Sequence, residues 1–262
     1  MTTGRAVLRQ LVETMGTVIS IEAHLGELGA DAAWVALARA KASLLRADAV
    51  FSTWKPNSPM SRLRRGEIAI GEGPGEIADV LARCEEARRL SGGWFDPWAM
   101  PGGVDPTGLV KGWAAARAAE LLEVGGLAAA MVNAGGDVAT FGEPVAGEPW
   151  RIGVQDPFRR DQLVAIAAVR SAIATSGCYE RGEHLIDPHT GARRADAASA
   201  SVVGPDLGIA DALATAICVA GPGALELLTD TAYEGLVVAH DGELVATRGF
   251  PFAPESDPTA SG

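Results

Sequence analysis

The chain alternates between β-rich and helical segments, but without the regular βαβ period of a doubly wound parallel sheet. This irregular order is the sequence feature that most limits the possible folds, because it argues against a parallel α/β architecture. A β-rich stretch at Val18–Ala23 follows a glycine-permitted turn at Met15–Thr17 and reads as the first strand. Further β-like segments, bounded by turn residues, lie at 150–154, 163–169 and 198–203. The pattern predicts an α+β fold with mixed, largely antiparallel sheets and packed helices in two intimately associated lobes.

Helices are predicted where apolar residues recur every three or four positions. The segments are 31–50, with Trp34, Leu37, Leu44 and Leu45; 77–84, with Ile77, Val80, Leu81 and Cys84; about 112–123; and 209–220. The second is stopped by Ser91–Gly93 and the last by Gly221-Pro222, as glycine and proline commonly do. A short hairpin is expected around Asp241-Gly242. Cys84 is expected in the core.

The domain organisation follows from length and composition. With 262 residues, 48% of them hydrophobic, the chain can bury a large core. We expect a single domain over residues 1–250. The segment 251–262 is rich in Pro, Ser, Thr and Ala, and we expect it to be a disordered tail because it cannot bury enough apolar surface to offset its ordering entropy.

The acidic balance restricts the class of partner. A net charge of -11, without long basic runs, argues against nucleic acid or an anionic membrane. No run reaches the roughly 18 apolar residues of a membrane helix. The three cysteines are widely separated, and neither a signal peptide nor a lipid-anchor cysteine is seen near the start, so we expect a cytoplasmic protein without stable membrane insertion.

An anion-binding turn is predicted at Asp105–Gly112, which places a carboxylate, a glycine turn and a lysine within eight residues at a helix start. Spare backbone N–H groups and the positive end of the helix attract phosphate, and Lys111 adds a mobile point charge. Since the net charge of the chain repels a polyphosphate, such an attraction must be local.

A hard-cation site is predicted from Asp211 and Thr215, which stand four residues apart and therefore share one face of a helix. Carboxylate, hydroxyl and backbone carbonyl oxygens suit Mg²⁺. The alternative is an ordinary aspartate on a solvated helix face, with Thr215 bonded to its own helix. Against this alternative, the two are the only polar side chains between Ile209 and Ile217, where a carboxylate needs a partner.

A proton acceptor is predicted at His184, which precedes an apolar step into the Asp187-Pro188 turn. Histidine titrates near neutral pH and is the usual group that deprotonates a hydroxyl nucleophile. A structural or surface role remains the alternative for a lone histidine.

Three other segments carry weaker signals. Trp54 and the run Trp94–Asp96 supply aromatic surface for a planar ring, with core packing as the alternative. Asn133–Asp137 allows close backbone approach by a ligand, although a simple turn explains it as well. Ser176 follows an apolar strand but lacks the sequence context of a nucleophilic serine.

In order along the chain, these segments resemble the FAD:protein FMN transferase family, the ApbE-like flavin transferases. The resemblance extends from Met15 to Gly221. It is carried by Met15–Thr17, Phe51–Trp54, Phe95–Pro97, Asp105–Gly112, Asn133–Asp137, Ser176-Gly177, His184–Gly191 and Ala210–Thr215. Each motif is weak by itself, and it is their number and order that carry the resemblance.

The resemblance implies Mg²⁺-dependent transfer of FMN from FAD to a threonine of an acceptor flavoprotein with a Ser/Thr-Gly-Ala-Thr type motif, forming a phosphoester and releasing AMP. It implies that Asp211, Thr215 and the carbonyl of Gly108 hold the metal and that His184 is the acid/base. It also implies FAD contacts by Met15, Trp54, Trp94, Phe95, Asp96, Asp105, Lys111 and Leu185.

Two alternatives stay open. With water as the nucleophile, the same metal site would act as a pyrophosphatase that splits FAD into FMN and AMP. A non-enzymatic protein that binds FAD would need no metal. The sequence also departs from the family near Arg64, where an Asn is usual, and at Cys178, where many members are acidic.

Overall fold

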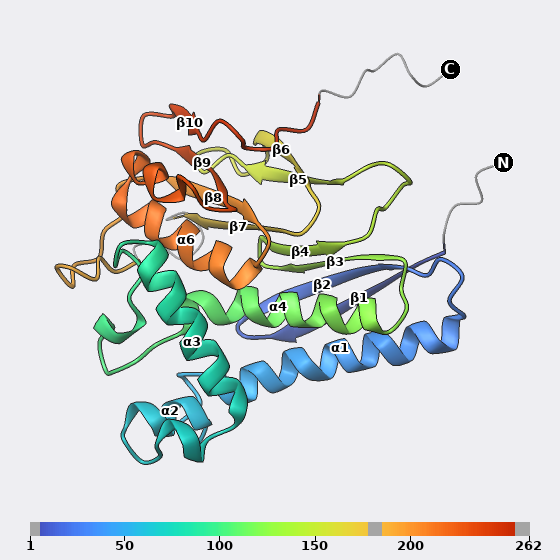
Figure 1. Cartoon of the computed structure of the whole chain (residues 1–262), viewed down its shortest axis with the longest axis horizontal. Coiled ribbons are helices and arrows are strands. Elements are labelled where there is room, and N and C mark those ends of the chain that lie inside the picture. Colours follow the sequence, from blue (N-terminus) through green and yellow to red (C-terminus); the bar gives the residue numbers. More distant parts are fainter. Residues whose placement is uncertain (1–5, 178–184, 255–262) are drawn as a thin grey trace.

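One eight-stranded antiparallel sheet forms the centre of the molecule in the computed structural model, which describes residues 6–177 and 185–254 (Figure 1). Its strands, in spatial order, are β1 (Val7–Thr14), β2 (Thr17–His24), β3 (Ala129–Ala134), β4 (Asp137–Phe141), β7 (Ala172–Gly177), β8 (Ser199–Gly204), β9 (Glu234–Val238) and β10 (Leu244–Ala246). All strand pairings within the described residues are antiparallel. The predicted α+β class is confirmed.

A separate two-stranded sheet, formed by β5 (Trp150–Gln155) and β6 (Leu163–Val169), covers the face of the central sheet that is opposite to the helices. Because side chains alternate along a strand, neighbouring residues enter different cores. In β4, Val138 packs into the smaller core with β5 and β6, whereas Ala139 packs into the larger core with the helices. The sheet thus separates two hydrophobic cores.

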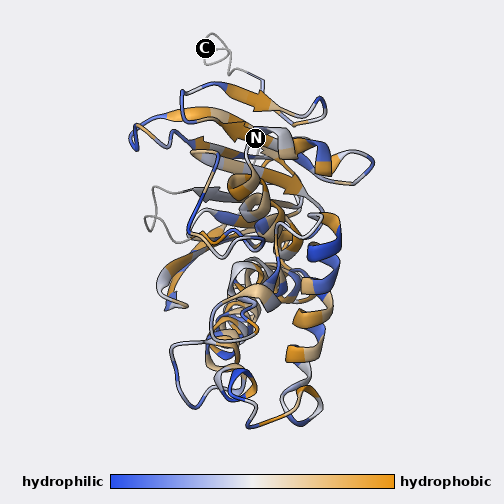
Figure 2. Ribbon diagram, turned by 90° about the vertical axis from the view of Figure 1, so that its left-hand side faces the viewer, coloured by the Kyte–Doolittle hydropathy of each residue, from blue (hydrophilic) through white to orange (hydrophobic). Residues whose placement is uncertain are grey.

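The helices lie together on the face that bears the larger core (Figure 1). They are α1 (Ala30–Phe51), α2 (Pro59–Arg64), α3 (Gly75–Leu90), α4 (Thr107–Val124) and α6 (Leu207–Ala220), with short 3₁₀ turns η1 (Ile70–Glu72), η2 (Pro97–Ala99) and η3 (Pro222–Leu228). Figure 2 shows hydrophobic residues concentrated along the strands and hydrophilic ones in the peripheral loops. The four predicted helices and the predicted hairpin at β9 and β10 are confirmed.

The buried face of α1 differs from the predicted one. Leu37 and Leu44 are buried as expected, but Trp34 and Leu45 are 47% and 43% exposed. Half of the buried residues of α1 are alanines, namely Ala33, Ala36, Ala40 and Ala47. Small residues let the helix approach its neighbours closely, so the largest apolar side chains did not mark the inner face.

The stretch predicted as the first strand is the second. β1 precedes it and pairs with it through the two-residue turn Met15-Gly16. Both turn residues have positive φ, 51° and 71°, as a type I′ hairpin turn requires. For the non-glycine Met15 this left-handed conformation costs roughly 1 kcal/mol. Backbone strain of this kind is concentrated at functional sites.

Helices α4 and α6 pack backbone to backbone. A Cβ on Gly112 would lie 2.5 Å from the carbonyl oxygen of Leu207 and 3.1 Å from the Cβ of Asp211. Only glycine at 112 therefore allows this approach. The amide of Gly112 also donates to Asp211 Oδ2 at 3.3 Å. The contact places the first two turns of α4 beside the first two turns of α6.

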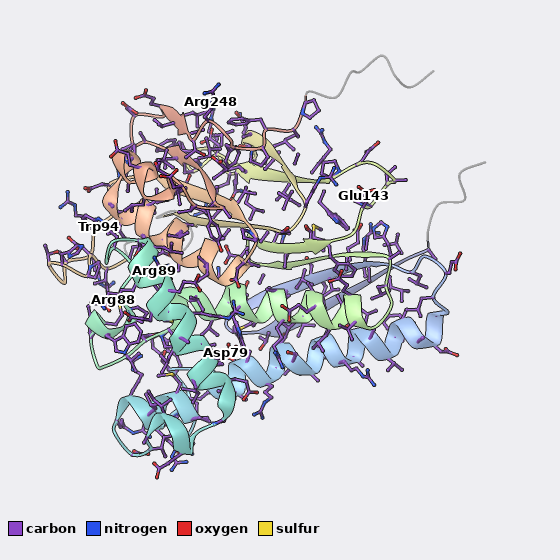
Figure 3. All side chains as sticks on the ribbon, in the orientation of Figure 1. Asp79, Arg88, Arg89, Trp94, Glu143 and Arg248 are labelled. Carbon is purple, nitrogen blue, oxygen red and sulfur yellow. The ribbon has the colours of Figure 1, made fainter. Side chains whose placement is uncertain are left out.

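Helix α3 braces both of these helices. Its Asp79 accepts a hydrogen bond from Trp113 Nε1 of α4 at 3.2 Å, and Figure 3 shows Asp79 close to α4. Its Arg83 forms an ion pair with Asp206, whose other oxygen caps α6 by accepting from the Ile209 amide at 3.0 Å. Charge and capping interactions thus fix the N-terminal end of α6.

The chain end was predicted to be disordered from residue 251, and this is wrong for residues 251–254. The Pro251 carbonyl accepts from Ala168 at 2.8 Å, and the Ala253 amide donates to Ile166 at 2.7 Å. The Phe252 ring lies against Phe250, with centroids 4.8 Å apart. Backbone bonds to the free edge of β6 therefore hold this segment, while residues 255–262 lie outside the described part.

Two further expectations concern the cysteines and the membrane. Cys84 is buried in the core, as predicted, and so is Cys218. None of the helices in the described ranges has the length and apolar character needed to cross a bilayer.

We predict that Gly112→Ala destabilises the protein by about 1–3 kcal/mol, because overpacking against Leu207 outweighs the higher helix propensity of alanine. Urea unfolding measures the change. The matched control is Gly75→Ala in α3, where a Cβ has nothing within 4 Å and the change should stay within about 0.5 kcal/mol. Equal stabilities of the two variants would contradict the close-packing argument.

Candidate functional site

Three adjoining cavities surround the N-terminal turn of α4. The first, of about 290 Å³, lies between α4, α6 and β7, and the second, of about 520 Å³, lies between α1, α4 and the β1–β2 turn. Thr107 and Lys111 line both. The third, of about 380 Å³, shares Asp105 with the first and Trp54 with the second. Together they form one cleft, which we call the α4 cleft.

The predicted site residues come from distant parts of the sequence and meet in the α4 cleft. The first cavity is lined by Trp94, Phe95, Asp96, Asp105, Gly108, Lys111, Leu185, Asp211 and Thr215, and the second by Met15 and Trp54. His184 lies outside the described residues, so its place in the cleft stays a prediction. The roles of all these residues likewise stay predictions.

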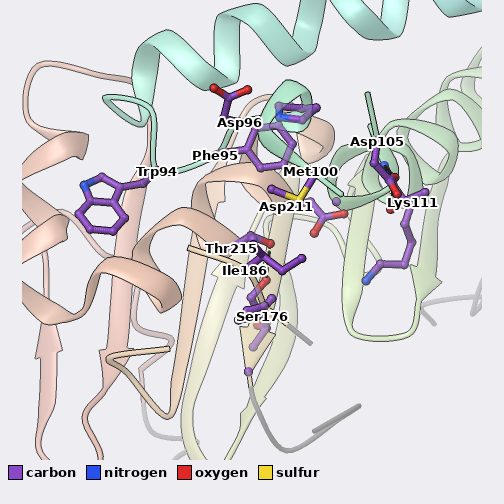
Figure 4. A pocket seen from close by; sticks show the side chains of 16 residues that line it. Trp94, Phe95, Asp96, Met100, Asp105, Lys111, Ser176, Ile186, Asp211 and Thr215 are labelled. Atoms are coloured by element: carbon purple, nitrogen blue, oxygen red, sulfur yellow. Dashed lines mark hydrogen bonds between the residues drawn. The ribbon is translucent and has the colours of Figure 1, made fainter. Parts of the chain in front are cut away.

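The proposed cation ligands lie on two helices that face the same cavity. Asp211 is 4% exposed and, like Thr215 one turn later, projects from α6 into the first cavity (Figure 4). Gly108 lines it from the first turn of α4. Because a carbonyl oxygen has two lone pairs, the Gly108 carbonyl keeps acceptor capacity even where it accepts from an amide of its own helix. All three groups offer oxygen.

Asp105 is an organising residue at the start of α4. One carboxylate oxygen accepts from the Thr107 amide at 3.1 Å and hydroxyl at 2.7 Å, and the other accepts from Arg64 at 2.6 Å. Arg64 also donates to the Pro101 carbonyl at 2.8 Å. The predicted ligand contact of Asp105 must therefore share a carboxylate that already fixes the helix start.

Burial and the Asp105 charge raise the pKa of the Cys84 thiol to about 12.

Lys111 forms an ion pair with Asp137, a fully buried carboxylate at the start of β4. Asp137 also accepts from the Thr175 amide at 3.1 Å. The sequence left open whether Asn133–Asp137 allows close backbone approach by a ligand or is a simple turn, and it did not single out Asp137 as a site residue. The sequence feature that could have indicated Asp137 is a carboxylate placed directly after a glycine pair at the end of an apolar segment.

The aromatic residues line different parts of the cleft. The Phe95 ring lies against α4, where a Cβ on Gly108 would be 3.1 Å from it. Trp94 makes an edge contact with His189, with ring centroids 4.6 Å apart, and lies on the side of the pocket away from Lys111 (Figure 4). Trp54 is 94% exposed, which excludes core packing, the alternative for these aromatic residues, in its case.

Asp96 has a structural task besides its predicted ligand contact. Its carboxylate caps the η2 turn by accepting from the Trp98 amide at 2.9 Å, and it accepts from Arg88 Nε at 2.9 Å. This cap holds the loop that carries Trp94 and Phe95 beside the first cavity.

The loop after Leu185 is held by the buried carboxylate of Asp187. Its oxygens accept from the His189 amide and from the Thr190 hydroxyl, both at 2.8 Å. Burial by itself raises the pKa of Asp187, but the bond from Thr190 and then the bonds from the amides outweigh it and lower the pKa below its ordinary value. The loop is thereby locked where Leu185 and Ile186 line the cavity.

Groups of three or more His, Cys, Asp or Glu side chains that could hold a metal do not occur in the described part of the chain. The predicted Mg²⁺ site does not require one, since it combines a single carboxylate with a hydroxyl and a carbonyl. Substrate phosphates and waters commonly complete the coordination of Mg²⁺.

Comparison with known families decides the affiliation. The profile described as "ApbE family" matches residues 15–102 and 100–237, most of the chain. The chain belongs to the ApbE family. The resemblance predicted from the ordered motifs is thus confirmed.

Two curated proteins that are similar to this chain share the same name. "FAD:protein FMN transferase" of Rhodobacter capsulatus is 37% identical over 120 residues, which cover 42% of this chain and 23% of the relative. The Salmonella typhimurium protein of the same name is 34% identical over 129 residues, covering 45% of this chain and 37% of the relative. The matches span well under half of these relatives.

Solved structures of ApbE proteins share the fold along nearly the whole chain. The flavin transferase ApbE from Vibrio cholerae superposes with a TM-score of 0.78 at 21% identity, covering 93% of this chain and 97% of that one. The ApbE protein from Thermotoga maritima gives 0.79 at 22% identity, with the same coverage. The α+β architecture is therefore that of the family.

We predict that Asp187→Asn lowers the melting temperature at pH 6 by roughly 2–4 °C. Because the folded-state pKa of Asp187 is depressed, its stabilisation is present above the ordinary carboxyl pKa of about 4 and is lost as the pH falls through the lowered value. The difference from the unmodified protein should therefore narrow below about pH 4. Thermal melts across the acid range test this, with the exposed Asp161→Asn as control; a constant difference would contradict it.

Proposed function

We propose that this protein transfers FMN from FAD to a threonine hydroxyl of an acceptor flavoprotein that carries a Ser/Thr-Gly-Ala-Thr type motif. In this reaction the pyrophosphate P–O bond breaks, its electron pair leaves with AMP, and the threonine oxygen forms a phosphoester with the FMN phosphorus. The observation that carries the proposal is the convergence of Asp211, Thr215 and Gly108 with Lys111 on one cavity of the α4 cleft.

The donor set fits Mg²⁺. Asp211, Thr215 and the Gly108 carbonyl would hold the ion, since all three offer the hard oxygen atoms that it prefers. When bound, Mg²⁺ supplies charge neutralisation for a pyrophosphate and its leaving group. Three carboxylates line this cavity, those of Asp96, Asp105 and Asp211, and they would repel a negatively charged pyrophosphate. A bound cation would offset this repulsion.

The residues of the chain itself supply positioning and charge. Lys111, held by buried Asp137, stands on the wall between the first two cavities, where its ammonium can contact a nucleotide phosphate or a ring edge. The second cavity offers the apolar Phe51 and Val110 beside Met15, which suits a planar ring. This separation of a polar cavity from a more apolar one matches a substrate with phosphates and aromatic rings.

Proton removal from the acceptor is assigned to His184. It directly precedes Leu185, whose loop Asp187 fixes at the first cavity. A neutral imidazole would take the threonine proton as the phosphoester forms. The names of the curated relatives and the family membership support transfer over simple storage of FAD.

The test is incubation of the purified protein with FAD, Mg²⁺ and an acceptor that carries the threonine motif, followed by intact mass measurement. Transfer predicts an acceptor heavier by FMN, and an acceptor with the motif threonine changed to valine should stay unmodified. Free FMN with an unmodified acceptor means that the protein is a pyrophosphatase. Unchanged FAD after prolonged incubation would favour the alternative of a non-enzymatic protein that binds FAD.

We predict that Asp211→Asn and Thr215→Val each lower Mg²⁺-dependent turnover by roughly a hundredfold or more, since a metal contributes several kcal/mol of charge stabilisation. Thr215→Ser keeps the hydroxyl and should retain most of the activity, which makes it the matched control. Release of AMP measures turnover. Undiminished Mg²⁺-dependent release by Asp211→Asn would exclude the metal assignment.

A further inference from the structure

Ser176 lines the first cavity without a role in the proposed chemistry. Its hydroxyl oxygen on β7 lies 2.9 Å from the hydroxyl oxygen of Thr215 on α6. Figure 4 shows Ser176, Thr215 and Asp211 along the same wall of the pocket. The serine thus contacts a proposed cation ligand directly, from a different element of the fold.

We propose that Ser176 is a positioning residue that holds the Thr215 hydroxyl toward the cation site. The inference rests on the proposed function, because it concerns the same metal ligands. When the Thr215 oxygen gives a lone pair to a cation, its proton must point elsewhere, and the Ser176 oxygen at 2.9 Å can accept it.

Threonine on a helix has a competing arrangement that explains the need for such a partner. A helical threonine divides between two rotamers because its hydroxyl can bond to the carbonyl four residues earlier, here that of Asp211. In that arrangement the hydroxyl donates its hydrogen bond to the backbone of its own helix. The bond to Ser176 favours the arrangement observed, in which Thr215 lines the cavity.

The backbone of Ser176 is well placed to act as a fixed reference. Ser176 pairs with Ala200 in the β7–β8 ladder, and the preceding amide of Thr175 is tied to Asp137. Strand β7 therefore contacts groups on both sides of the cavity. It bonds to Asp137, which pairs with Lys111, and through Ser176 it bonds to Thr215.

A matched hydroxyl pair lies nearby. Thr175 and Ser201 are joined by the same kind of bond at 2.8 Å, and Ser201 is buried but does not line the cavity. Ser201→Ala removes a comparable bond from Thr175, which lines the cavity but is not one of the proposed cation ligands. If Ser176 acts only on stability, the two alanine variants should behave alike.

The test measures binding of Mn²⁺ alone, as a stand-in for Mg²⁺ that also takes oxygen ligands, by electron paramagnetic resonance of the free ion. We expect Ser176→Ala to weaken binding roughly three- to tenfold, the factor of one neutral hydrogen bond. Ser176→Thr, which keeps the hydroxyl, should restore affinity, and Ser201→Ala should leave it unchanged. Equal affinity of Ser176→Ala and the unmodified protein overturns the inference and leaves the proposed function standing.

A double-mutant cycle separates positioning from direct ligation. If Ser176 acts through Thr215, Ser176→Ala should weaken Mn²⁺ binding no further once Thr215→Val is present. Additive losses would show that Ser176 binds the ion independently, which overturns the positioning role. Absence of Mn²⁺ binding by the unmodified protein would overturn both this inference and the metal site of the proposed function.

Discussion

The close approach of α4 and α6 is the contact on which the rest of the cleft depends. Because Gly112 has no side chain, the backbone of α6 comes near enough for the Gly112 amide to reach Asp211. Asp211 and Thr215 are thereby set opposite the first turn of α4, where Gly108 and Lys111 lie. A single missing Cβ thus determines the width of the cavity in which the chemistry is proposed.

Much of this arrangement could be predicted where the pattern and the physical requirement coincide. The stripe Ile77–Cys84 is both periodic and buried, and the pair Asp211 and Thr215 shares a cavity because four residues make one helical turn. Other elements escaped prediction for definite reasons. Strand β1 mixes Arg9, Gln10 and Glu13 into its apolar alternation, and the inner face of α1 places alanines beside Leu37 and Leu44, so large residues alone do not define that face.

The motifs predicted many of the residues that line the α4 cleft, but only as far as those motifs extended. What they could not convey is how the polar groups divide their hydrogen bonds. Asp105 serves a helix start and Arg64 at once, and Lys111 is shared with buried Asp137. These pairings link segments that are far apart in sequence, so spacing alone does not reveal them. They explain how several charged groups are held together at one cavity.

The strand order has a consequence for how the cleft comes into being. Helix α4 lies in the first half of the chain, whereas α6 lies between β8 and β9, the last two strands of the sheet before β10. During synthesis from the N-terminus, the wall that carries Lys111 exists long before the wall that carries Asp211. A complete cleft therefore requires synthesis to have passed α6, and a chain interrupted before α6 lacks both Asp211 and the helix against which α4 packs.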